Sequence, residues 1–136
     1  MTWVRRRRLP AHLVEAYEAF RALVPGLEAA KEALMTSVPS TRLPGRPLAE
    51  ALLGFEEGLR AVEAGMDAWR VPEVEADWVA ARDGLRRALQ LAERLRLEAP
   101  DPGGFEGLIG LVEELLAPLE AFEAAIGRFR DLAGRR

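Results

Sequence analysis

Four stretches of the sequence share one constraint, because their apolar residues recur at alternating intervals of four and three positions. Apolar residues at this spacing fall on one side of an α-helix, whereas a half-buried β-strand needs a period of two. The pattern therefore predicts long amphipathic helices, each with one buried stripe. The clearest stripe keeps this spacing without a slip through Leu48, Leu52, Phe55, Leu59, Val62, Met66 and Trp69.

Prolines and glycines mark the ends of these helical stretches, and the connections between them are short. Long helices joined by short connections favour antiparallel neighbours. We therefore predict an all-α fold, an antiparallel up-down-up-down four-helix bundle. An offset of 60 residues aligns the second and fourth apolar stripes and pairs Arg70 with Arg130. A bundle built from a duplicated helical hairpin is therefore an alternative interpretation. The predicted helical stretches are residues 10–38, 47–70, 72–99 and 104–133.

The chain has 136 residues, of which 49% are hydrophobic, and this is enough to build one core. We assign residues 1–9 to a basic N-terminal arm and residues 10–136 to a single bundle domain. The absence of cysteine excludes disulfides, thiolate nucleophiles and cysteine-ligated metals. No apolar run is long enough to cross a membrane, so we expect a cytoplasmic protein. The single lysine against 18 arginines and the lack of asparagine fit a GC-rich coding sequence and a thermophilic source.

Two helical stretches contain an internal proline, Pro25 in the first and Pro118 in the fourth. Proline removes a backbone donor and bends or breaks a helix. The favoured interpretation is curvature around the core. The alternative is a gap between helices that admits a ligand.

The apolar stripes contain no acid, base or histidine, which argues against a bundle enzyme with inward-facing metal ligands. Acidic residues are expected on a solvated face. The nearest candidates for a magnesium cluster in a nucleotide-processing enzyme are Glu56, Glu57, Glu73 and Asp77, and His12 has no second histidine to share a metal. We therefore expect no catalytic residue, no metal site and no cofactor, and we keep a metal-dependent nucleotide enzyme as the second alternative.

In the predicted bundle, the end that holds the start of the first helix also collects aromatic and arginine residues. This combination suits stacking on an anionic partner, but it equally suits core packing and the compensation of helix dipoles, which we favour. The residues concerned are Trp3, His12, Tyr17, Trp69, Trp78, Phe129, Arg70, Arg128, Arg130, Arg135 and Arg136.

Some apolar residues fall outside the stripes, and Leu53, Ile109 and Leu116 are the candidates for an exposed interaction patch, with Leu91 a further apolar residue outside its stripe. A small helical protein with surplus apolar surface is typical of a dimer or an adaptor. The leading hypothesis is therefore a non-enzymatic interaction or scaffold protein that self-associates or binds a protein partner through this patch.

The first alternative is binding of nucleic acid or another anionic surface through Arg5, Arg6, Arg7 and Arg8. The net charge of −3 argues against a protein that coats nucleic acid over its whole surface. The arm is nevertheless basic, while the rest of the chain holds 15 basic and 22 acidic residues. The arm can therefore either follow a phosphate backbone or fold back on the acidic body as a tether, and we favour the tether slightly.

Replacing Arg5, Arg6, Arg7 and Arg8 with alanine distinguishes these two roles. Four phosphate contacts on duplex DNA would weaken binding about a hundredfold between about 50 and 200 mM salt, a slope of about −3.6. Loss of this binding with unchanged thermal melting would support the arm as a binding element. If the intact protein binds neither RNA nor DNA at the low end of this salt range, only the tether remains.

Overall fold

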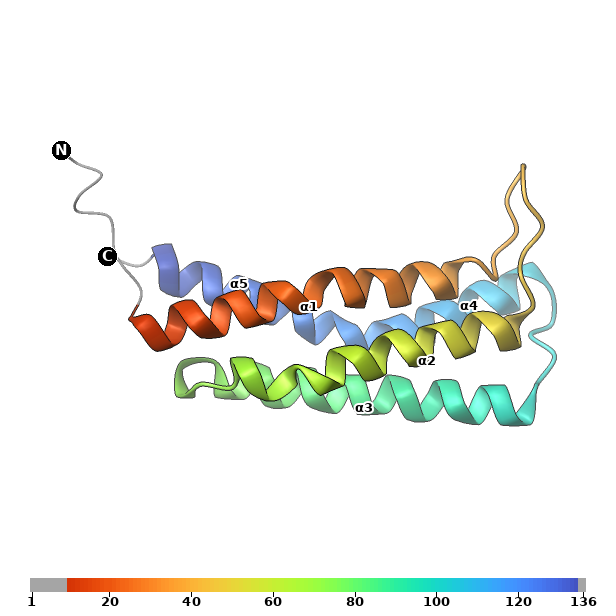
Figure 1. The fold of residues 1–136 in the computed structure, drawn as a ribbon. Coiled ribbons are helices and arrows are strands. Elements are labelled where there is room, and N and C mark those ends of the chain that lie inside the picture. Colours follow the sequence, from red (N-terminus) through yellow and green to blue (C-terminus); the bar gives the residue numbers. More distant parts are fainter. Residues whose placement is uncertain (1–9, 135–136) are drawn as a thin grey trace.

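The computed structural model describes residues 10–134, which form α-helices, short 3-10 turns and connections, with no strand among them (Figure 1). The predicted all-α helical bundle is confirmed. Arg5, Arg6, Arg7 and Arg8 lie outside the described residues. The α-helices are α1 (Ala11–Met35), α2 (Leu48–Ala64), α3 (Glu75–Glu98), α4 (Phe105–Leu116) and α5 (Ala121–Gly134), and the 3-10 turns are η2 (Met66–Trp69), η3 (Pro72–Val74) and η4 (Ala117–Glu120).

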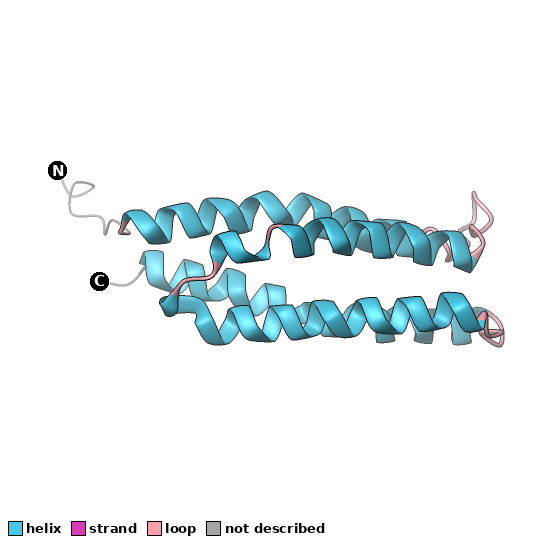
Figure 2. Ribbon diagram, turned by 60° about the horizontal axis from the view of Figure 1, so that its bottom comes forward, coloured by secondary structure: helices cyan, strands magenta, loops and turns pink. Residues whose placement is uncertain are grey.

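The helices lie along one rod, and Figures 1 and 2 show them as two pairs that follow the same long axis. Along the chain, α1 runs away from the end where α5 finishes, α2 returns, α3 runs out again, and α4 with α5 comes back (Figure 1). α1 packs against α2, α2 against α3, and α3 against η4 and α5. One end of the rod therefore holds the start of α1 and the end of α5, and the other holds the α1–α2 and α3–α4 connections.

The predicted apolar stripes form the core. Leu59 and Leu119, at the middle of their stripes, are completely buried. Leu48, Leu108 and Ile126 are only partly buried. The helical period therefore predicts the buried face correctly along most of the rod.

Large aromatic side chains fill the core near the start of α1. The rings of Phe20 and Trp69 meet edge to face with centroids 4.8 Å apart, and Phe129 lies 5.5 Å from Phe20 and 6.2 Å from Trp69. Phe122 completes this cluster. Edge-to-face and tilted pairs at these distances are favourable for aromatic rings. In the other half of the rod, small residues let the backbones of α1 and α2 approach closely. The space beside Gly58 of α2 is so narrow that a Cβ there would clash with the Cβ of Ala30 in α1.

The two internal prolines have different effects. Pro25 leaves α1 unbroken, and since both Pro25 and Arg21 are exposed, the carbonyl that Pro25 leaves without a donor can be hydrated. Pro118 instead converts one turn into η4, which divides the predicted fourth helix into α4 and α5. At this break the backbone of α3 comes very close, because buried Gly84 faces the carbonyl oxygen of Pro118.

Gly84→Ala tests this close approach, because a Cβ at Gly84 would overlap the Pro118 carbonyl oxygen. Overpacking of this kind should lower the free energy of unfolding by about 1–3 kcal/mol, measured by chemical denaturation. The control is Gly110→Ala, whose Cβ has no neighbour within 4 Å and which should stabilise α4 by about 0.5–1 kcal/mol. A stabilising effect at both glycines would contradict the close contact.

Candidate functional site

The end of the rod that holds the start of α1 contains most of the aromatic and arginine residues singled out from the sequence. Trp69 and Phe129 are buried in the core, and Trp78 is buried with its indole N–H donating a 2.8 Å hydrogen bond to the Met66 carbonyl oxygen. Tyr17 packs on Phe129 with ring centroids 5.4 Å apart. These aromatic rings are therefore used by the fold and do not form an open stacking surface.

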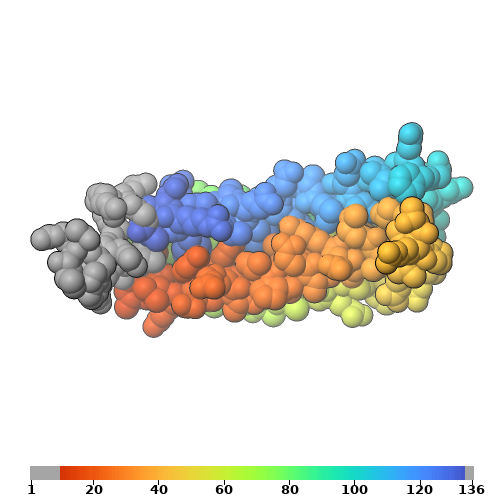
Figure 3. Space-filling model, turned by 90° about the horizontal axis from the view of Figure 1, so that it is seen from above, coloured from red at the N-terminus to blue at the C-terminus, as the bar shows by residue number. Residues whose placement is uncertain are grey.

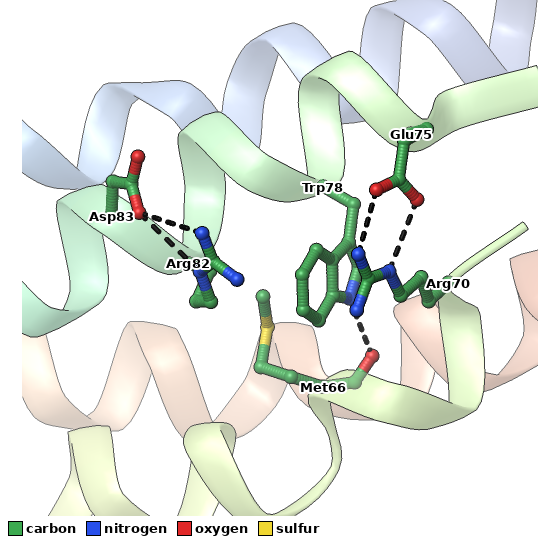
Figure 4. Close-up of polar contacts among 6 residues, drawn as sticks. All are labelled: Met66, Arg70, Glu75, Trp78, Arg82 and Asp83. Carbon is green, nitrogen blue, oxygen red and sulfur yellow. Dashed lines mark hydrogen bonds and ion pairs between the residues drawn. The ribbon is translucent and has the colours of Figure 1, made fainter. Parts of the chain in front are cut away.

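The arginines beside Trp78 are also engaged (Figure 4). The Arg70 guanidinium lies 4.1 Å from the Trp78 ring centroid and donates hydrogen bonds of 3.0 and 2.7 Å to the two carboxylate oxygens of Glu75. This hydrogen-bonded guanidinium holds the pKa of Glu75 below its ordinary value. Arg82 lies 5.2 Å from the other side of the indole and pairs with Asp83. The indole therefore lies between two cations that each have a carboxylate partner.

A histidine–carboxylate hydrogen bond and an ion pair also join separate elements at this end. His12 at the start of α1 lies 2.7 Å from a carboxylate oxygen of Glu73 in η3, and this contact lowers the pKa of Glu73. Arg128 of α5 lies 3.1 Å from Asp77 of α3. These charges bind the elements to one another, which supports the structural interpretation of the aromatic and arginine residues.

Glu56 is a correction to the sequence analysis, which expected it on a solvated face. Its side chain is completely buried, and Arg96 of α3 donates two hydrogen bonds of 2.7 and 3.1 Å to its carboxylate. The guanidinium of Arg60 lies 3.6 Å from the same carboxylate and 3.7 Å from the carboxylate of Glu93. A buried carboxylate needs such pairing, so the network joins α2 to α3. The sequence signal was weak: Glu56 and Arg96 each flank the apolar stripe, and nothing local pairs them.

The four candidate magnesium ligands do not come together. Glu56 pairs with Arg96, while Glu73 and Asp77 pair with His12 and Arg128. Among the described residues there is no group of three or more histidine, aspartate or glutamate side chains placed to hold a metal ion. No helix of the described part is both long and apolar enough to cross a membrane.

A groove of about 620 Å³ lies between α3 and α4 beside the Pro118 break. Arg87 and Arg94 occupy one row of α3, seven residues apart, and neither makes an ion pair with a described residue. Glu114 faces the same groove, so the positive charge there is partly offset. The polar residues that line the groove are all exposed. Its lining residues are Arg87, Gln90, Leu91, Arg94, Glu114, Ala117 and Pro118.

Of the predicted interaction patch, Leu53 lies on α2, whereas Ile109 and Leu116 lie on α4. Leu53 is 44% exposed on α2, which packs against α1 and α3. Leu116 of α4 is partly buried against the core and lines a second groove with Lys31 of α1. Ile109 lies two turns before Leu116 and is also partly buried. The structure therefore leaves only Leu53 of the three as a well-exposed apolar side chain.

Leu53 instead belongs to a group that the sequence analysis missed. Six large apolar side chains are exposed in the described part of the chain, and five of them lie in the α1–α2 and α3–α4 connections or within about two helical turns of them. Only Val14, near the start of α1, lies at the other end. Figure 3 shows the α1–α2 connection and the start of α4 at the right-hand end of the rod. We call it the distal pole, and define it by Met35, Leu43, Leu53, Leu97 and Phe105.

Comparison with known proteins finds no matching family model, no matching curated protein and no matching solved structure. Functional inference therefore depends on the residues of this chain. Of the surfaces described above, the distal pole is the one with several large apolar side chains open to solvent.

Arg70→Met tests the charge pairing beside Trp78. Because Arg70 holds the Glu75 carboxylate in its ionised form, the substitution should raise the pKa of Glu75 towards its ordinary value, measured by NMR titration. The pair stabilises the folded state above the ordinary carboxylate pKa, and this contribution is lost as the pH falls through the lowered pKa. Arg86→Met, on an arginine without an ion pair among the described residues, is the control and should leave Glu75 unchanged. An unaltered pKa in Arg70→Met would refute the pairing.

Proposed function

We propose that this protein is a non-enzymatic interaction protein whose distal pole binds a protein, either a partner chain or a second copy. One observation carries the proposal: of the six large apolar side chains that are exposed among residues 10–134, five lie at this pole. Single exposed apolar side chains are ordinary on a protein surface, whereas a group of them marks a contact surface.

The pole residues are surplus to the core. Met35 directly follows the buried Leu34, and Leu53 directly follows the buried Leu52, so the apolar stripe is already complete beneath them. Their exposure therefore does nothing for the stability of the bundle. A surface that keeps such side chains in water at no benefit to folding is best explained by a partner that covers them.

The α1–α2 connection holds one of these side chains in place. Leu43 is 70% exposed, yet its backbone N–H and carbonyl oxygen both hydrogen-bond to Ser40, at 3.1 and 2.9 Å. The Arg46 N–H donates to the Thr36 carbonyl oxygen at 2.8 Å and closes the base of the connection. Pro39, Pro44 and Pro47 stiffen it further. A side chain presented on a rigid connection loses little entropy on binding, which favours association.

Site-specific photo-crosslinking in the native cell tests the proposal. We expect a photoreactive amino acid at position 53 to form protein adducts, and the same amino acid at position 14 to form none. The two positions are a matched pair, since Leu53 is 44% and Val14 42% exposed at opposite ends of the rod. Equal adduct yields at both positions, or adducts from position 14 alone, would overturn the proposal.

A further inference from the structure

The two connections at the distal pole carry opposite charges. The α1–α2 connection, residues 36–47, contains Arg42 and Arg46 and no acidic residue. The α3–α4 connection, residues 99–104, contains Asp101 and no basic residue, and Glu98 and Glu106 stand just before and after it. All five charged side chains belong to exposed residues. We call residues 36–47 the basic half of the pole and residues 98–106 its acidic half.

These charges are largely unused within the described chain. Arg42, Glu98 and Glu106 make no ion pair with a described residue, and Arg46 has only a 4.0 Å contact with exposed Glu50. Asp101 accepts a 2.9 Å hydrogen bond from the Gly103 N–H through Oδ1, which leaves Oδ2 open. At the other end of the rod, Arg70, Arg128 and His12 have carboxylate partners, whereas Arg21 and Arg130 have none among the described residues.

The two halves lie on opposite edges of the pole. α1 packs beside α2 and α3 beside α4, so the two connections run along opposite sides of the four-helix arrangement. In Figure 3 the right-hand end of the rod is formed by the orange-yellow α1–α2 connection and the cyan start of α4. Exposed apolar side chains occur in both halves, with Leu43 in the basic connection and Phe105 next to Glu106.

We propose that the distal pole binds the distal pole of a second copy of this chain, end to end. A twofold axis perpendicular to the rod would place the basic connection of each copy against the acidic connection of the other, with Leu43 and Phe105 of each copy beside the contact. A symmetric twofold interface requires such a self-complementary surface, because each patch must contact its own copy. This inference rests on the proposed function and names the partner of the same surface.

The size of the pole sets the strength expected of this dimer. Four helices, each about 10 Å wide, present an end of about 400 Å², while a stable interface covers about 800 Å² on each partner. The dimer should therefore be weak and depend on protein concentration. Its ion pairs are exposed at the rim, so salt should weaken it further.

Charge reversal of each half tests the proposal with the full chain. One variant carries Arg42→Glu and Arg46→Glu, and the other carries Glu98→Arg and Glu106→Arg. The control, Arg86→Glu with Arg87→Glu, changes the net charge as the first variant does, but on the exposed side of α3. Sedimentation velocity over a wide range of protein concentration measures dimerisation, and circular dichroism verifies that each variant is folded.

We expect dimers of the wild type and of the control, monomers of each pole variant alone, and recovery of dimers when the two pole variants are mixed. The first pole variant has two acidic halves and the second has two basic halves. One copy of each variant can therefore still pair opposite charges across the interface, which restores the dimer. A wild type that stays monomeric, or a mixture that does not recover, would overturn the proposal. Adducts of position 53 with a different protein would then preserve the proposed function, whereas the absence of any adduct there would remove both.

Discussion

Burial of one apolar stripe per helical stretch is the interaction on which the rest of the structure depends. Leu34, Leu59, Leu85 and Leu119 are completely buried, and each comes from a different stretch. Removing such side chains from water is the main favourable contribution to folding. Because the stripes continue along most of each helix, the helices must stay roughly parallel, which gives the molecule its rod shape and two distinct ends.

The same stripes pack differently along the rod, and polar contacts follow from that packing. Aromatic rings separate the helices at one end, whereas glycine and alanine bring their backbones together elsewhere. One such case is Gly84 against the Pro118 carbonyl oxygen, which brings α3 next to the break between α4 and α5. Between α2 and α3, Glu56 is sealed from water and bound by Arg96, so these two helices are joined by charge as well as by apolar contact.

The two ends of the rod use the same kinds of residue in opposite ways. Near the start of α1, most of the aromatic rings are buried, and Arg70 lies over Trp78 and is paired with Glu75. At the distal pole, Leu43 and Phe105 are open to solvent and Arg42 has no ion-pair partner in the described part of the chain. The first end is held together by these contacts, although the buried Trp69 indole N–H has no hydrogen-bond partner among the described residues, and the second is the end that we propose binds another molecule.

The sequence by itself determined the helices and the buried stripes, because the helical period depends only on the local spacing of residues such as Leu59 and Leu119. The tertiary structure decided what lies between the stripes. Glu56 is buried because Arg96, 40 residues later, lies opposite it on α3. The distal pole likewise gathers side chains from segments far apart in the chain, while Leu116 turns partly into the core. These outcomes depend on how each helix is rotated and aligned against its neighbours, which local periodicity does not specify.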